Sequence, residues 1–190
     1  MKYSLRFNPK PEWNNNDRLN RYFFGLFKML FDLFILLKDV KNPKMLEIGS
    51  YKGESTFMFA SSGIFKEIHC IDPYKGKEEA KGIFKESWDE VKKEFKQNTR
   101  YFDNITLHKD YSYNIVDKFK DGYFDFIYID ASHEYEDVKK DLELYLPKTK
   151  YIIGGHDYQK EWPGVVKAVN EKFGRAHKKY EDESWLVLIK

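Results

Sequence analysis

The sequence contains one cysteine among 190 residues, and this scarcity removes two classes of structure. A single thiol, Cys70, excludes an intramolecular disulfide bond and any metal site built from several cysteines. Cys70 lies in an apolar stretch with the composition of a strand, and free cysteine is among the residue types most often buried. We therefore interpret Cys70 as a small residue of the core.

The sequence also lacks an excess of either charge. Its 33 basic and 31 acidic residues leave a net charge of +2. Proteins that attract nucleic acid through their surface field need a clear positive excess, so we expect no nucleic-acid partner. Residues 1–16 are polar and lack the apolar core of a signal peptide, and we expect a cytoplasmic protein.

The sequence has no run of about 20 uninterrupted apolar residues, the length that spans a bilayer. Its most apolar segment, residues 22–37, is interrupted by Lys28 and Asp32, which a helix would place on one face. Three roles stay open for a helix over residues 17–38. It can pack over a sheet, form the interface of a homo-oligomer, or lie at a membrane surface, and the membrane is the least favoured partner.

The length of the chain allows one domain with a sizeable core and little more. Residues 1–16 are turn-rich, and a polar hinge at residues 41–44 follows the apolar segment. We predict an N-terminal arm and apolar helix over residues 1–40 and a single domain over residues 41–190.

Two nucleotide-binding signatures are missing as well. The chain has no G-x-G-x-x-G motif, and no Lys-Ser/Thr pair closes a glycine-rich loop. Residues 45–56 instead read MLEIGSYKGEST, a pattern typical of a strand, a tight turn and the start of a helix. Glycine has no Cβ, so Gly49 and Gly53 let a ligand approach the main chain, and the helix N-terminus offers unpaired N–H groups. We predict a binding site for a flat or polar ligand here.

An acidic residue ends the next predicted strand. The apolar stretch over residues 64–72 ends in Asp72, which would lie beside the glycine turn in a doubly wound sheet. Its two carboxylate oxygens can accept hydrogen bonds from both hydroxyls of a ribose. An aspartate that only caps a turn or helix is the alternative.

Titratable residues also follow two later predicted strands, which lie beyond a short strand over residues 105–108. Asp130 and His133 follow the apolar run over residues 123–129, and His156 and Asp157 follow the next one. Parallel strands bring their carboxyl ends to one edge of a sheet, so we expect these four residues to converge. A protein that only binds a nucleoside has no use for converging titratable groups, and this pattern therefore favours an enzyme.

The spacing Glu47-x-Gly49-x-x-x-Gly53 resembles the first motif of the class I S-adenosylmethionine (SAM) dependent methyltransferases. Two strand ends, I-D-x-x-H-x-Y at residues 129–135 and H-D-Y at residues 156–158, resemble one small group of that family, and the likeness runs from about residue 45 to 173. The resemblance implies an α/β fold. It is a single Rossmann-like, three-layer domain with a mostly parallel seven-stranded sheet of order 3-2-1-4-5-7-6 and an N-terminal helical extension.

The same resemblance implies SAM as the methyl donor and a set of residues that contact it. The expected contacts are Glu47, Gly49, Ser50, Gly53 and Ser55 to the methionine part, Asp72 to the ribose, Asp110 and Tyr111 to the adenine, and Asp130 beside the donor.

Relatives in this group that methylate sugar or small-molecule hydroxyls bind a divalent metal, and their ligands carried over are Asp130, His156 and Asp157. Two departures weaken this assignment: Ser132 stands where those relatives often have a second acid, and His156 also stands in place of an acid. Oxygen ligands suit Mg²⁺, whereas histidine shifts the preference toward ions such as Mn²⁺. We expect methyl transfer to a small-molecule or sugar hydroxyl, with His133, His156 and Asp157 as the catalytic residues and His133 as the base.

Three other functions stay open. One is a metal-free methyltransferase in which His133 and His156 act as base and orienting group. Another is a non-catalytic, nucleoside-binding subunit of an oligomer. The last is a nicotinamide oxidoreductase, and the missing third glycine of the turn counts against it.

Overall fold

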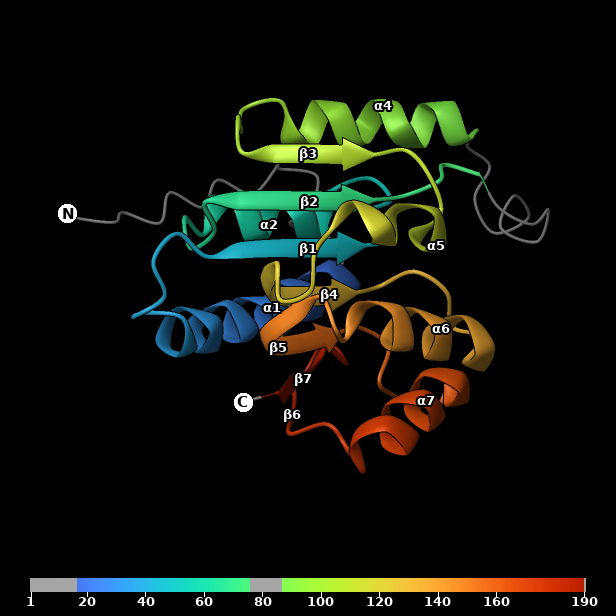
Figure 1. The fold of residues 1–190 in the computed structure, drawn as a ribbon. Coiled ribbons are helices and arrows are strands. Elements are labelled where there is room, and N and C mark those ends of the chain that lie inside the picture. The colour runs from blue at the N-terminus through green and yellow to red at the C-terminus, as the bar shows by residue number, and fades with distance from the viewer. Residues whose placement is uncertain (1–16, 76–86, 190) are drawn as a thin grey trace.

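The computed structural model describes residues 17–75 and 87–189, whose strands form one seven-stranded sheet (Figure 1). The sheet order is β3-β2-β1-β4-β5-β7-β6. The strands are β1 (Lys44–Ile48), β2 (Glu67–Ile71), β3 (Ile105–His108), β4 (Phe124–Ile129), β5 (Thr149–Gly155), β6 (Lys178–Lys179) and β7 (Trp185–Leu188). Strands β1 to β5 pair in parallel, and β7 runs antiparallel to β5 and β6. The predicted fold class and strand order are confirmed.

Strand β4 shows why a parallel sheet forms at these residues. All six residues of its sequence, FDFIYI, are buried, as expected for a strand covered by helices on both faces. Most residues of the neighbouring strands β1 and β5 are buried as well, and β4 pairs with both strands. Because β1, β4 and β5 lie at the centre, the residues that follow them meet at one edge of the sheet.

Helices cover both faces of the sheet. They are α1 (Asp17–Leu36), α2 (Glu54–Ser61), α4 (Trp88–Thr99), α5 (Ser112–Ile115), α6 (Tyr135–Tyr145) and α7 (Pro163–Phe173), with a 3₁₀ turn, η2 (Val116–Lys118), after α5. Apolar side chains of α1, α2 and α4 share one core cluster, and those of α6 and α7 belong to the other. Figure 1 shows α4 along β3 at one end of the sheet and α7 at the opposite end.

Helix α1 packs inside the fold through one of its faces. Leu26, Met29 and Leu33 are fully buried. The helix also touches the loop between β6 and β7, because a Cβ on Gly25 would lie 2.0 Å from Oδ1 of Asp182. The expected packing over the sheet is therefore present. The division into residues 1–40 and 41–190 stays a prediction, and residues 1–16 lie outside the described ranges.

Among the described residues, no helix has the length and apolar character needed to cross a membrane.

Candidate active site

The turn after β1 lies directly against the residue that follows β4. Gly49 has a φ of 89°, and a Cβ on it would lie 2.0 Å from the carbonyl oxygen of Asp130. The backbone N–H of Asp130 donates to the carbonyl of Ile48 at 2.8 Å. Only glycine permits this approach, so the glycine turn and the first residue of the titratable cluster form one continuous surface.

Glu47 is directed away from that surface. Its side chain is fully buried in β1, and its carboxylate accepts hydrogen bonds from the hydroxyls of Ser55 and Thr56 in α2. Burial raises the pKa of Glu47 to about 7, although both hydroxyls act in the opposite direction. Glu47 and Ser55 therefore fix the start of α2 against β1, and a direct contact of either with SAM stays a prediction.

The other predicted residues of the glycine turn are also held in place. Ser50 is buried, with its Oγ 3.4 Å from the hydroxyl of Tyr74. Gly53 caps the N-terminus of α2 with a φ of 78°, and a Cβ there would lie 2.8 Å from the ring of Phe95. A side chain at position 53 would thus strain the backbone and collide with α4.

Asp72 joins the loop after β2 to the glycine turn. Its two carboxylate oxygens accept the backbone N–H groups of Tyr51 and Tyr74, each at 2.8 Å. Burial raises the pKa of Asp72. A third backbone hydrogen bond, from Ser50, also reaches this carboxylate. A carboxylate has about four acceptor positions, so acceptor capacity for a ribose hydroxyl remains.

Asp110 and Tyr111 lie further along the same edge, after β3. One oxygen of Asp110 accepts from the backbone of Tyr111 and from the side-chain amide of Asn114, both at 2.8 Å. The Tyr111 ring stacks on that of Tyr113 at a centroid distance of 5.3 Å. β3 is three places from β4 in the sheet, so these residues do not belong to the cluster around Asp130.

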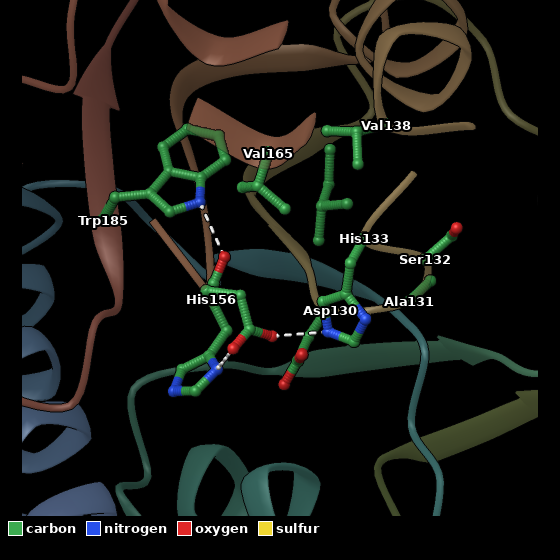
Figure 2. A pocket seen from close by; sticks show the side chains of 10 residues that line it. Asp130, Ala131, Ser132, His133, Val138, His156, Val165 and Trp185 are labelled. Atoms are coloured by element: carbon green, nitrogen blue, oxygen red, sulfur yellow. Dashed lines mark hydrogen bonds and ion pairs between the residues drawn. The ribbon is translucent and has the colours of Figure 1, made fainter. Parts of the chain in front are cut away.

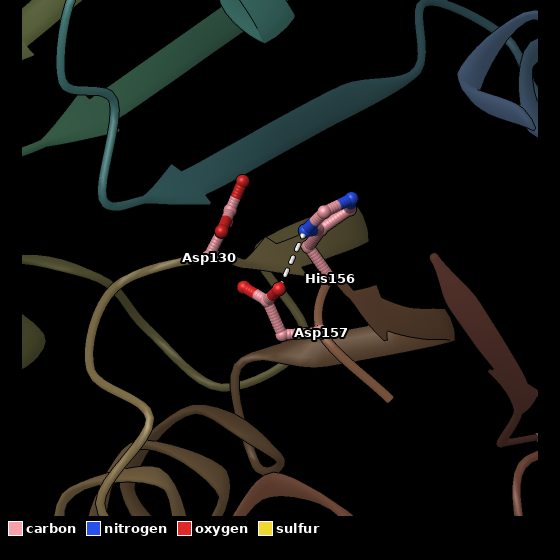
Figure 3. Close-up of side chains that lie close together, drawn as sticks. All are labelled: Asp130, His156 and Asp157. Atoms are coloured by element: carbon pink, nitrogen blue, oxygen red, sulfur yellow. Dashed lines mark ion pairs between the residues drawn. The ribbon is translucent and has the colours of Figure 1, made fainter. Parts of the chain in front are cut away.

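The four titratable residues predicted at the ends of β4 and β5 do come together. Asp157 lies between two imidazoles: its Oδ2 is 2.8 Å from Nε2 of His133, and its Oδ1 is 3.2 Å from Nδ1 of His156. Asp157 has a φ of 60°, an uncommon backbone conformation that persists only where the surroundings hold it. Potential ligand atoms of Asp130, His156 and Asp157 all lie within 4.8 Å of one another (Figure 3).

In this cluster, the pKa of each titratable group depends on the charges of its neighbours. Burial alone would lower the pKa of His156, but the carboxylates of Asp130 and Asp157 raise it to about 9. Burial raises the pKa of Asp130 to about 6. Burial opposes ionisation of Asp157, yet its hydrogen bonds with His133 and His156 hold its pKa well below the usual range. Asp157 is thus the permanent anion of the cluster, and both imidazoles donate to it.

Trp162 completes the cluster, and its position was not predicted. Its ring stacks on the imidazole of His133 at a centroid distance of 3.9 Å and an interplanar angle of 20°. A Cβ on Gly164 would lie 2.3 Å from the carbonyl oxygen of His133, so the start of α7 packs tightly against this loop. Pro163 is typical of the first turn of a helix, and it indicates the start of α7 but not this stacking.

A pocket opens between these elements (Figure 2). Its lining combines the polar cluster with apolar side chains from α6, α7 and β7, namely Ile129, Asp130, Ala131, Ser132, His133, Val138, His156, Asp157, Val165 and Trp185.

A second titratable cluster, also not predicted, lies within the sheet. Nδ1 of His69 is 2.8 Å from Nε2 of His108, and Nε2 of His69 is 2.6 Å from Glu67. Glu67 further accepts from Lys44 at 2.8 Å and from the hydroxyl of Tyr123. This set pairs within itself and lies apart from the pocket.

Strand order, glycine turn and polar strand ends together define the fold of the class I SAM-dependent methyltransferases. A family model described as a methyltransferase domain matches residues 46–158, more than half of the chain. The chain belongs to this family. Its place in the small group with I-D-x-x-H-x-Y and H-D-Y strand ends stays a prediction.

Solved structures share the fold at low sequence identity. An O-methyltransferase from Bacillus cereus, in complex with SAH, superimposes with a TM-score of 0.58 at 14% identity, covering 86% of this chain and 81% of that one. The O-methyltransferase TomG from Streptomyces achromogenes, involved in tomaymycin synthesis and in complex with SAM, gives 0.57 at 10% identity, covering 86% and 80%.

One curated relative matches by sequence. The uncharacterized protein y4gI of Sinorhizobium fredii is 27% identical in an alignment 128 residues long, which covers 64% of this chain and 14% of that protein. The chain thus corresponds to a small part of that relative.

Proposed function

We propose that this chain transfers the methyl group of SAM to a hydroxyl oxygen of a small molecule or sugar. The observation that carries this proposal is the convergence of Asp130, His133, His156 and Asp157 on the surface that Gly49 forms with the loop after β4. With the donor bound at the glycine turn, as in the family, these groups would lie close enough to its methyl group to transfer a proton. O-methyltransferases among the structures with this fold support the choice of oxygen as acceptor.

The glycine turn would hold the donor. The backbone N–H groups of Gly49 and Gly53 donate to the carbonyls of Ile71 and Ser50 and keep the turn in shape. The N-terminus of α2, which follows Gly53, would favour the methionine carboxylate. The remaining acceptor capacity of Asp72 would bind the ribose, and Asp110 with Tyr111 would contact the adenine. The enzyme's main contribution is then alignment of the hydroxyl oxygen with the methyl carbon, which can supply several kcal/mol of the barrier.

His133 would act as the base. Because Asp157 accepts from Nε2 of His133, the lone pair of the imidazole lies on Nδ1. The acceptor oxygen forms a bond to the methyl carbon, the bond from that carbon to sulfur breaks, and the hydroxyl proton passes to Nδ1 of His133. Asp157 stabilises the imidazolium that results. The Trp162 ring, stacked on His133, holds the orientation of the imidazole and favours its cationic form.

The donor set of Asp130, His156 and Asp157 fits a divalent cation. Two carboxylates and one imidazole lie close enough to share an ion, and this set of ligands suits Mn²⁺ better than Mg²⁺. When bound, such an ion lowers the pKa of a coordinated hydroxyl. His133 would then orient Asp157 through its hydrogen bond as well as accept the proton.

Metal-free transfer is the second candidate, and the arrangement of Asp157 favours it. Its two oxygens are each already paired with an imidazole, at 2.8 and 3.2 Å, so the carboxylate of Asp157 has partners without a metal ion. His133 would be the base and His156 the group that orients Asp157.

Two measurements test the proposal. Calorimetric titration with SAM and with NAD⁺ tests the donor, and we expect binding of SAM only, weakened in Asp72→Asn but retained in Asp121→Asn, a variant of an exposed residue. Binding of NAD⁺ instead of SAM would overturn the methyltransferase assignment. SAH release is then followed with a panel of sugars and phenols, in EDTA and with Mn²⁺ or Mg²⁺. Turnover only with a metal supports the first mechanism, and equal turnover in EDTA supports the second.

A further inference from the structure

Helix α1 has a stripe of exposed apolar side chains on the side away from its buried face. Phe27, Phe31, Phe34 and Ile35 are 49%, 61%, 56% and 47% exposed. Their spacing of four, three and one residues places them along one side of the helix. We call these four residues the α1 stripe. The buried face of α1 already packs on the core, so the stripe is additional apolar surface.

The area of the α1 stripe exceeds what isolated surface residues explain. Large aromatic side chains have about 150–250 Å² each, so these exposures leave on the order of 400 Å² of apolar surface. Contiguous patches of a few hundred Å² mark contact sites with other molecules. Two stripes packed on one another would bury about 800 Å², and with a polar rim this is the size of a weak, reversible dimer.

The charges beside the α1 stripe favour a second copy of this chain over a charged partner. Lys28 pairs with Glu181 at 2.6 Å, and Lys178 pairs with Asp32 at 2.5 Å. Positive and negative groups are therefore balanced and engaged within the chain. An anionic membrane selects clusters of unpaired lysine and arginine, and an acidic or basic protein selects the opposite excess.

The sheet edge near α1 offers no competing route to self-association. β6 is the outermost strand, has two residues, and both Lys178 and Lys179 are exposed. Short edge strands with lysine oppose strand addition. At this end of the molecule, self-association through α1 is therefore favoured over strand addition at β6.

We propose that two copies of this chain form a symmetric dimer in which α1 packs antiparallel on α1 of the partner. A twofold axis places the same patch on both subunits, so each stripe must fit itself, as an apolar stripe without net charge does. Phe31 lies at the centre of the stripe, and the two Phe31 side chains meet at the axis. This dimer does not depend on the proposed methyl transfer.

Sedimentation velocity of the full chain over a range of micromolar concentrations tests the dimer. We expect a dimer for the wild type and for Tyr101→Glu, a control at an aromatic residue that is 72% exposed elsewhere. The double variant Phe31→Glu and Phe34→Glu should be a monomer with the same melting temperature and the same SAM affinity. Because both positions are exposed, charge there should leave the fold intact.

A covalent test locates the axis. Phe31→Cys should form a disulfide-linked dimer on mild oxidation, whereas Tyr101→Cys should not, and the buried Cys70 does not interfere. A wild-type chain that stays monomeric at every concentration measured overturns the proposal, even if another molecule covers the α1 stripe. So does a dimer that survives the double glutamate substitution. Loss of SAM binding in every variant and in the wild type would instead contradict the proposed function alone.

Discussion

Nε2 of His133 lies 2.8 Å from Oδ2 of Asp157, which joins the loop after β4 to the end of β5. Both groups are partly exposed to solvent, with side-chain exposures of 35% and 13%. An imidazole held by a carboxylate and stacked on an aromatic ring has a fixed orientation and a stabilised protonated form. Burial opposes that form, yet Asp157 raises the pKa of His133. The pair therefore resembles a base with its orienting group, and this role can be tested directly.

We expect His133→Gln to lower kcat by about 100- to 10,000-fold, the usual contribution of a general base. Glutamine keeps a donor for Asp157 but cannot accept the proton. SAM affinity and melting temperature should be unchanged, because the glycine turn and Asp72 do not involve His133. Steady-state kinetics of SAH release measures the effect. Glu136→Gln, at an exposed position on α6, is the control. Wild-type activity in both variants would exclude His133 from the reaction.

The contact of Gly49 with Asp130 predicts that Gly49→Ala abolishes SAM binding. A positive φ alone costs a non-glycine residue about 1–3 kcal/mol of stability, and the clash at 2.0 Å adds to this cost. Gly174→Ala is a matched control, since Gly174 has a φ of 79° with no atom within 4 Å of its Cβ position. Chemical denaturation and SAM calorimetry measure both quantities. Equal destabilisation by the two substitutions would show that the contact with Asp130 is unimportant.

The buried carboxyl of Glu47 predicts a pH-dependent stability. Its pKa is about 7 in the folded chain against an ordinary value of 4.5, so folding favours the protonated form. This contribution is complete below pH 4.5 and is lost as pH rises through 7, by roughly 3 kcal/mol if the full shift applies. Glu47→Gln should therefore lose less stability than the wild type between about pH 4.5 and 7.5. Glu136→Gln, at an exposed position on α6, should retain the wild-type slope in denaturation curves.

Much of the fold and part of the site could be predicted from the sequence, for a physical reason. Apolar runs that end in polar residues specify parallel strands, and parallel strands bring their carboxyl ends to one edge. The convergence of Asp130, His156 and Asp157 could therefore be predicted without knowing the packing angles of the helices. The resemblance to methyltransferases supplied the strand order, which the alternation of strands and helices alone does not determine.

Contacts that depend on register or on loop geometry could not be predicted. His69 and His108 meet because β2 and β3 pair with Ile71 opposite His108, and a different register would separate the imidazoles. The stacking of Trp162 on His133 depends on how closely α7 approaches the loop after β4, and Gly164 permits that approach. Sequence spacing contains no information on either.

Metal binding is the prediction that separates the two candidate mechanisms. Calorimetric titration of EDTA-treated protein with Mn²⁺ should show one site, and Asp130→Asn should weaken it by at least about 100-fold, since it removes a charged ligand. Asp110→Asn, three strands away, should bind Mn²⁺ like the wild type. Affinity should fall at low pH, because protons compete for the carboxylates and the imidazole. An unchanged Mn²⁺ heat in Asp130→Asn would place the ion elsewhere. No heat in the wild type, with activity retained in EDTA, would leave His133, Asp157 and His156 as the complete catalytic machinery.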